Sequence, residues 1–329
     1  MVMRKRMMTL VMMTMRRRMP MIMNLFLLKI YLLTIIVILI IIIVIIQGCI
    51  SSQSRPVILE LLVSVDLPET PDDEEEPLLS GLDFLPDGRL VAVDNKNKKM
   101  IILNERLQRV GTPYKFKTNP RDVLYLPHNE LAVTRGGNNV SFLSVISDNV
   151  TRLKREINTP FDAYYICCKS PSNMVVSTFN DSRPVRMITV DCVESEFDQV
   201  KFPKNTYKKG ESSCTYVQSK NTLVLTDRLA HTVFIYDTFK GTSRAVTGET
   251  IKEPRGACVG PGETVLVCSK KKNSIVHLTV DGAILGTYPV DMELPYSICV
   301  SKDGTRLAVS NVFVGNRKLQ LYKISPAHS

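Results

Sequence analysis

Acidic side chains recur at the start of three successive β-rich segments, a placement that could support metal-dependent hydrolysis. Asp83, Asp122 and Asp162 follow one another at intervals of roughly forty residues. Carboxylates that converge at the inner ends of strands can bind calcium, and the ion can then activate water or an ester carbonyl. Later segments of the same kind have no acid at this position. A calcium-dependent hydrolase is therefore an alternative function and not the favoured one.

Lysine clusters in predicted turns are a second candidate site. The candidate basic patch consists of Lys96, Lys98, Lys99, Lys270, Lys271 and Lys272, and a further cluster contains Lys204, Lys208 and Lys209. If the recurring segments form a closed ring of sheets, turns at equivalent places lie on the same rim. Their lysines would make that rim positively charged, so it could bind the phosphate backbone of RNA. Lysine in turns usually only increases solubility, and the patch has no interleaved aromatic side chains to stack on bases. RNA binding is therefore another alternative.

The chain carries no recognisable catalytic motif. A Gly-x-Ser-x-Gly nucleophile elbow, a His-Glu-x-x-His metal pair, a phosphate-binding loop and a dinucleotide fingerprint are absent. The histidines His128, His231, His277 and His328 are scattered without metal-ligand spacing. His277 lies in an apolar run, where we expect a packed ring rather than a ligand. We therefore predict no catalytic residue, no metal and no cofactor.

The cysteines have the pattern of small buried hydrophobic residues. Cys167 and Cys168 are neighbours in a predicted strand, so their side chains point to opposite faces and are not expected to bond each other. Cys214, Cys258 and Cys299 occupy similar positions in three of the β-rich segments that recur along the chain. Free cysteine packs like a small aliphatic side chain, so we favour burial over disulfides. Disulfide pairing is the alternative for an oxidising compartment.

The positive net charge comes mainly from the N-terminal region. The 329-residue chain has a formal charge of +10, but residues 1–50 contain seven basic and no acidic side chains. The remaining chain has 35 basic and 32 acidic residues, which is close to balance. Residues 1–24 form a basic, methionine-rich leader. A charge excess beside an apolar segment is typical of a membrane orientation signal rather than of nucleic-acid binding.

Residues 25–46 are almost entirely apolar and are predicted to form a transmembrane helix. At about 1.5 Å per residue, a helix of this length crosses a hydrocarbon core about 30 Å thick. Its one charge, Lys29, can reach the headgroups from the N-terminal end. A cleaved signal peptide is one alternative, but the apolar run is longer than the apolar region of a typical signal peptide. A lipoprotein cleavage site at Gly48-Cys49 is a second alternative.

The leader arginines favour a cytoplasmic N-terminus for a single-pass protein, with the rest of the chain extracellular or luminal. Three N-glycosylation motifs, at Asn139, Asn149 and Asn180, agree with this topology. The repetitive leader also has the character of a mistaken translation start, and in that case the protein would be cytoplasmic.

Residues 47–80 are predicted to form a linker that includes one strand. The apolar run at residues 57–67 has strand character. The acidic, proline-flanked stretch at residues 68–77 has the composition of a solvated loop. It lacks the glycine and the alternating ligand spacing of a calcium loop, so calcium binding is not expected there.

From residue 81 onward the chain repeats at roughly forty residues, the period of one four-stranded blade of a β-propeller. The six units start at Gly81, Pro120, Pro160, Ser212, Pro254 and Pro295. In the first unit the expected strands are residues 81–85, 89–93 and 99–103, and Asp87-Gly88 marks the hairpin turn between the first two. The predicted fold is an all-β six-bladed propeller at residues 81–329, preceded by a single transmembrane helix.

The last unit has only three recognisable strands, at residues 297–301, 306–311 and 318–325. The run at residues 57–67 is placed to supply the fourth. We therefore expect the ring to close by pairing this N-terminal strand with the final blade, which removes exposed sheet edges.

The turn between the second and third strands resembles the NHL repeat of six-bladed propellers, as found at the C-terminus of tripartite-motif-like proteins. Residues 91–103 follow its pattern closely, with Asp94, Asn97 and the basic Lys99 before an isoleucine-led strand. Asp94 and Asn97 are expected to bond the turn backbone. Two later units depart from the pattern, with Ala230 and Thr232 in one and Ser269 and Lys272 in the other.

The resemblance covers residues 81–325 and implies a propeller that binds a partner, which for some NHL propellers is RNA. It does not extend to the RING and B-box zinc modules of full tripartite-motif proteins, because no cysteine and histidine ligand series is present.

We therefore expect a membrane-tethered interaction module rather than an enzyme. Turns on one rim would recognise a protein, peptide or glycan partner, since loops vary freely while the blades must keep their packing. The bilayer is a second partner, through residues 25–46. RNA binding and calcium-dependent hydrolysis of the lactonase or arylesterase type are the alternatives.

Overall fold

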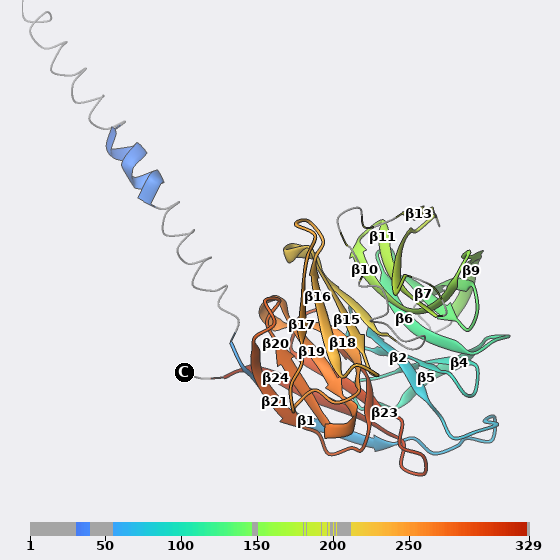
Figure 1. The fold of residues 1–329 in the computed structure, drawn as a ribbon. Coiled ribbons are helices and arrows are strands. Elements are labelled where there is room, and N and C mark those ends of the chain that lie inside the picture. The colour runs from blue at the N-terminus through green and yellow to red at the C-terminus, as the bar shows by residue number, and fades with distance from the viewer. Residues whose placement is uncertain are drawn as a thin grey trace, which may run out of the picture. The chain divides into compact units, whose positions relative to one another are not determined.

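The computed structural model describes residues 31–39, 55–146, 151–179, 181, 183–191, 193–195, 197, 200, 202 and 212–327. Its strands form six four-stranded antiparallel sheets, arranged as the blades of a propeller (Figure 1). Each innermost strand contacts the innermost strands of the two neighbouring blades, so the blades form a closed ring. The predicted all-β six-bladed propeller is confirmed.

The strands follow one another from the centre of each blade outward. Blade 1 contains β2 (Leu79–Phe84), β3 (Leu90–Asp94), β4 (Lys99–Leu103) and β5 (Arg109–Lys115). Blade 2 contains β6 (Pro120–Leu126), β7 (Glu130–Arg135), β8 (Asn139–Val145) and β9 (Thr151–Asn158). Blade 3 contains β10 (Asp162–Ser170), β11 (Asn173–Phe179), β12 (Val185–Thr189) and β13 (Glu194–Ser195).

The second half of the ring is built in the same way. Blade 4 contains β14 (Cys214–Val217), β15 (Thr222–Asp227), β16 (Thr232–Asp237) and β17 (Thr242–Val246). Blade 5 contains β18 (Pro254–Gly260), β19 (Thr264–Ser269), β20 (Ser274–Leu278) and β21 (Ile284–Pro289). Blade 6 contains β22 (Pro295–Val300), β23 (Arg306–Asn311), β24 (Lys318–Pro326) and β1 (Val57–Asp66). Turns include the short 3-10 helices η1 (Gln218–Lys220), η2 (Pro261–Glu263) and η3 (Lys270–Lys272).

The turns of the blades define two faces of the ring. Successive strands are antiparallel, so the turn after the innermost strand and the turn after the second strand lie at opposite ends of a blade. We call the end with the first kind of turn face A and the end with the second kind face B. Face A carries the Asp87-Gly88 turn, and face B carries the lysine-bearing turns at residues 95–98 and 270–273.

The hydrophobic core lies between neighbouring blades. Residues 223–225, 265–267 and 307–309, in the second strands of three blades, are at most 1% exposed. One cluster joins Val91 of blade 1 to Val133 of blade 2. Burial on both sides explains why these strands are continuous apolar runs instead of alternating ones.

The ring closes through its N-terminal strand. β1 pairs antiparallel with β24, from Val57 opposite Pro326 to Asp66 opposite Lys318, with a bulge between Leu61 and Val63. Figure 1 shows the blue β1 beside the red end of the chain. The first strand is therefore the outermost strand of the last blade, at the place where the sequence lacks a fourth strand.

The acidic stretch at residues 68–77 is a loop with mostly exposed residues, as expected, but Asp73 within it is docked on the ring. Asp73 forms a buried ion pair with Lys99, and the two side chains are 0% and 4% exposed. The Oδ1 atom of Asn97 accepts the backbone N–H groups of Glu74 and Glu75. Local sequence does not reveal these contacts, because the partners lie in the β3–β4 turn and at the start of β4.

The strand bounds differ from the expected ones by a few residues. The third strand of the first unit is residues 99–103 as expected, whereas the second begins one residue later and ends at Asp94. The outermost strands of blades 1–5 are not delimited by the sequence pattern. Strands such as β5 consist of exposed and half-buried residues and contain no apolar run, so their hydrophobic signal is weak.

The predicted N-terminal segments lie largely outside the described residues. Of residues 25–46, the structure describes residues 31–39, which are helical. None of the helices among the described residues combines the length and the hydropathy that a membrane span needs. The leader, Asn149 and Asn180 are likewise outside the described residues, whereas Asn139 is half-buried at the start of β8.

Candidate functional site

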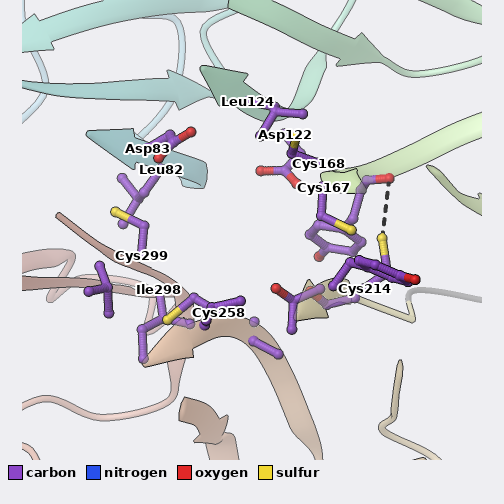
Figure 2. A pocket seen from close by; sticks show the side chains of 18 of the residues that line it. Leu82, Asp83, Asp122, Leu124, Cys167, Cys168, Cys214, Cys258, Ile298 and Cys299 are labelled. Atoms are coloured by element: carbon purple, nitrogen blue, oxygen red, sulfur yellow. Dashed lines mark hydrogen bonds between the residues drawn. The ribbon is translucent and has the colours of Figure 1, made fainter. Parts of the chain in front are cut away.

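A cavity of about 360 Å³ occupies the central channel. All six innermost strands contribute to its wall, and the face A turns contribute Gln218, Pro261, Ser301, Lys302 and Gly304. The lining is mostly apolar side chains, thiols and hydroxyls, with Asp83, Asp122 and Lys302 as its charged residues. Figure 2 shows Asp83 and Asp122 together with the thiols of blades 3 to 6 around this space.

A hydrogen bond crosses the channel on the face B side of the cavity. The hydroxyl groups of Tyr165 in β10 and Tyr296 in β22 lie 2.7 Å apart and are buried. Blades 3 and 6 are opposite each other in the ring, so this contact joins opposite walls. The guanidinium of Arg255 lies 5.1 Å from the centre of the Tyr296 ring. The channel therefore narrows toward face B, and the cavity lies on the face A side.

Asp83 in β2 is held by both backbone and side-chain donors. Its Oδ1 accepts the N–H of Phe84 (2.8 Å) and its Oδ2 accepts the N–H of Tyr125 in the next blade (2.7 Å). The ammonium group of Lys302 donates to the same carboxylate, at 3.0 Å from Oδ1 and 3.3 Å from Oδ2. Asp83 is thus an ion-paired side chain in the wall of the cavity.

Asp122 in β6 makes the same kind of backbone contacts. Its Oδ1 accepts the N–H of Val123 (2.9 Å), and its Oδ2 accepts the N–H of Ile166 in the next blade (3.0 Å). Burial raises the pKa of Asp122 to about 8, and the nearby charge of Asp83 adds to the rise, while the two N–H groups oppose it. The carboxyl group is therefore largely protonated at neutral pH.

Glycine at position 81 allows Asp122 to take this position. A Cβ atom on Gly81 would lie 2.5 Å from both the Cα and the Oδ1 atoms of Asp122. The innermost strands of blades 1 and 2 can therefore approach this closely only because residue 81 has no side chain.

The structure brings together two of the three recurring acids. Asp83 and Asp122 both line the cavity, whereas Asp162 stands at the first position of β10 and is not part of the lining. Among the residues that the structure describes, no three histidine, cysteine, aspartate or glutamate side chains are grouped closely enough to share a metal ion. The set of acids expected for calcium-dependent hydrolysis is thus not assembled in the described channel.

Five thiols line the same cavity: Cys167, Cys168, Cys214, Cys258 and Cys299. All five are free. Burial raises the pKa values of the Cys167, Cys258 and Cys299 thiols well above their ordinary range, so these groups are neutral at physiological pH. The sequence pattern predicts buried cysteines, but their position in the channel wall depends on the closed ring.

The candidate basic patch is partly neutralised and lies on face B. Lys99 is buried in its ion pair with Asp73, and Lys96 pairs with Glu75 at 2.6 Å. Lys270 lies 3.4 Å from Glu253. The remaining members, Lys98, Lys271 and Lys272, are half-buried or exposed. The patch is therefore at the opposite end of the blades from the face A turns that border the cavity.

His277 is a packed ring, as the sequence predicts. It is 0% exposed in β20, and its Nε2 atom is hydrogen-bonded to the Thr264 hydroxyl at 2.7 Å. Burial lowers the pKa of His277 to about 4, so the ring is neutral. No histidine is among the residues that line the cavity.

Asp94 and Asn97 have the structural role that the turn pattern predicts. Asp94 Oδ1 accepts the N–H groups of Leu78 (3.0 Å) and Asn97 (3.3 Å). Its other oxygen accepts from the side-chain amide of Asn97 at 2.8 Å. These contacts hold the β3–β4 turn in place.

No family model and no curated protein sequence matches this chain. Solved structures match its fold at low sequence identity. Streptogramin B lyase has a TM-score of 0.55 and 15% identity, covering 81% of this chain and 87% of that chain. The luciferin-regenerating enzyme has a TM-score of 0.61 and 10% identity, covering 83% and 98% of the two chains.

A catalytically inactive virginiamycin B lyase from Staphylococcus aureus, solved with quinupristin, has a TM-score of 0.55 and 16% identity, over 80% of this chain and 88% of that chain. A protein of unknown function from Bacteroides thetaiotaomicron has a TM-score of 0.62 and 10% identity, over 82% and 77% of the two chains. These likenesses establish a six-bladed propeller and do not establish the NHL or tripartite-motif assignment.

Proposed function

We propose that this chain is a ligand-binding propeller that takes a small ligand, or the tip of a larger partner, into the central cavity. The cavity itself carries the proposal. Its volume of about 360 Å³ falls in the usual range for small-molecule sites. Its lining combines apolar side chains with thiols, hydroxyls, two carboxyl groups and one ammonium group, so a ligand can make both apolar contacts and directed hydrogen bonds there.

A protein, peptide or glycan partner remains compatible with this site. Such a partner would insert one side chain, one chain end or one sugar past the face A turns. This differs from recognition by rim turns alone, because the enclosed channel would supply most of the buried contact area. The RNA alternative is less favoured, since several lysines of the face B patch are paired with acids of the same chain.

The proposal is tested by narrowing the mouth of the cavity. Gln218 is exposed in η1 and lines the cavity, so Gln218→Trp should block entry without disturbing the core. Small molecules are screened by thermal shift against the full-length protein. Hits should lose at least tenfold in affinity for the Gln218→Trp protein and bind normally to the matched face B variant Lys272→Trp. Equal binding to both variants would show that the ligands do not enter the cavity.

Enzymatic activity is a second candidate, favoured by one observation. Asp122 has a pKa near 8 inside a cavity, which is the property of a general acid or base that works at neutral pH. The lyase and the luciferin-regenerating enzyme among the similar folds are consistent with a channel that supports catalysis. Esterase and lactonase substrates should then be turned over with a rate that changes through about pH 8 and disappears in Asp122→Ser.

The membrane tether also belongs to the proposal. The apolar residues 25–46 and the basic leader support a single-pass topology with the propeller extracellular or luminal. Treatment of the full-length protein with a glycosidase should lower its mass if the motif at Asn139, Asn149 or Asn180 is used. Digestion of the propeller by protease added from the cytosolic side would reverse the orientation.

A further inference from the structure

Two carboxyl groups in the cavity wall have matched backbone contacts and differ in one partner. Asp83 and Asp122 each accept the N–H of the next residue in their own strand and one N–H from the next blade. Asp83 also accepts two hydrogen bonds from the ammonium group of Lys302. The corresponding cation is missing at Asp122 among the described residues. One of two equivalent acids therefore lacks its counter-ion.

The groups that face Asp122 cannot supply this cation. Asp83 on β2 is negative, and its field raises the pKa of Asp122 rather than lowering it. Cys167 on β10 and Cys299 on β22 interact electrostatically with Asp122, and both thiols are neutral because burial raises their pKa values. Lys302 is the one cation in the cavity lining, and it already binds Asp83.

We infer that the cavity binds an organic ammonium ion and that Asp122 is its counter-ion. The ammonium group of the ligand would do at Asp122 what Lys302 does at Asp83. This inference rests on the proposed function, since it names the class of ligand that the cavity takes. The carboxylate oxygens of Asp122 each accept one backbone N–H and keep a further lone pair for the ligand.

The rest of the lining suits an apolar body attached to the ammonium group. Tyr165 and Tyr216 provide aromatic rings, and Leu124 with the neutral thiols provides an uncharged wall. Aromatic faces attract cations, and apolar surface favours hydrocarbon over water. The ligand class is therefore an aryl or alkyl amine, rather than a carboxylate or a phosphate, for which the lining offers no cation besides Lys302, already paired with Asp83.

Binding has a defined proton balance and forms no covalent bond. The free protein holds a proton on Asp122 at neutral pH, because its pKa is about 8. The ligand enters as its ammonium form, the Asp122 carboxyl gives its proton to buffer, and an ion pair remains. Below pH 8 one proton is therefore released for each ligand bound. Affinity should rise by about tenfold per pH unit from pH 6 to 8, since the ligand favours the ionised carboxylate.

The experiment uses three probes of the same shape and different charge: naphthylethylammonium, naphthylethanol and naphthylpropanoate. Binding to the full-length protein is measured by isothermal titration calorimetry at pH 6.5 in two buffers of different ionisation enthalpy. The ammonium probe should bind at least tenfold more tightly than the other two and release close to one proton. Proton release should fall toward zero at pH 9.

Variants identify the group that releases the proton. Asp122→Ser keeps a hydroxyl that can accept a backbone N–H and should remove both the proton release and the preference for the cation. Lys271→Gln, which changes one exposed charge on face B, should leave both unchanged. Circular dichroism melting curves check that each variant is folded. If Asp122→Ser does not fold, the pH dependence of proton release by the wild-type protein tests the same inference.

The outcomes separate the two proposals. Equal binding of all three probes, or tighter binding of the alcohol without proton release, would overturn the ammonium inference and leave the cavity as a ligand site. Proton release that persists in a folded Asp122→Ser protein would also overturn it. If none of the probes binds, and no ligand from the thermal-shift screen is sensitive to Gln218→Trp, both proposals fail.

Discussion

Asp73 and Asp122 are both buried carboxyl groups, one where the ring closes and one in the channel. Asp73 lies against Lys99 and also accepts hydrogen bonds from Thr70. Burial alone would raise the pKa of Asp73, but its hydrogen bonds with Lys99 and Thr70 outweigh burial and hold it below its usual value. Burial raises the pKa of Asp122, which has no such cation. A buried carboxyl group that is paired with a cation of the same chain stabilises the fold. A buried carboxyl group without such a cation can instead pair with a cation of a ligand.

The largest expected effect is the loss of the buried pair at the ring closure. Asp73→Ala would leave Lys99 buried with Asp94, at 3.9 Å, as its remaining ion-pair partner in the described part of the chain. Removal of one partner from a buried pair usually costs several kcal/mol, and here we expect a loss of about 3 kcal/mol in the free energy of unfolding at pH 7. Urea unfolding measures it. A loss below about 1 kcal/mol would show that the docked acidic stretch contributes little to closure.

The two acids should also have opposite pH dependence. The Asp73 pair contributes stability above the unfolded pKa of the carboxyl group, and this contribution is lost as the pH falls through the lowered folded pKa. Asp122 has a raised folded pKa, so its contribution is present below about pH 4 and is lost as the pH rises toward 8.

Asp122→Ser should therefore become more stable than the wild type as the pH increases. We expect its relative stability to gain about 2 kcal/mol between pH 5 and 9, less than the full linkage value because water can reach the channel. Urea unfolding at a series of pH values measures the difference. A constant difference across this range would show that Asp122 ionises with an ordinary pKa in the folded protein.

The contact that crosses the channel should have an intermediate effect. Tyr165→Phe and Tyr296→Phe each remove one hydroxyl of the buried pair and so break the hydrogen bond between them. We expect a loss of about 1–2 kcal/mol for each variant. The double variant should lose clearly less than the two single losses together, and additive losses would show that the hydroxyls do not interact in solution.

The smallest expected effect is the loss of an exposed ion pair, which serves as the control for the buried Asp73–Lys99 pair. Lys96 and Glu75 form an ion pair beside Asp73, but both side chains are exposed, at 39% and 56%. Exposed pairs contribute little, so Lys96→Gln should change the free energy of unfolding by less than about 0.5 kcal/mol. A larger loss would mean that the charge of the docked stretch matters as a whole, rather than through the buried Asp73–Lys99 pair.

The blades could be predicted from sequence because their determinants are local. The innermost, second and third strands of a blade are separated by short turns, and signals such as Asp87-Gly88 fix the hairpins. Continuous apolar runs mark strands covered on both sides. The outermost strands of blades 1–5 were not delimited because one of their faces meets solvent, which removes most of the hydrophobic signal.

The candidate site was only partly predictable. Asp83 and Asp122 could be singled out from their spacing, but the same spacing included Asp162, which does not line the cavity. The lysine patch was chosen by charge alone, and charge does not reveal that Lys99 is paired with Asp73. Gly81, two residues before Asp83, was a local signal of close approach between strands, and its meaning depends on Asp122 in the next blade.

The sequence by itself determined the six units, because the strands and turns of a unit are near one another in the chain, and the count of strands indicated that an N-terminal strand completes the last unit. Tertiary structure decided which acid has a cation. Asp83 meets Lys302 across 219 positions of the sequence, and Tyr165 meets Tyr296 across 131. Such contacts form only when the ring closes, since closure sets which blade ends face each other across the channel.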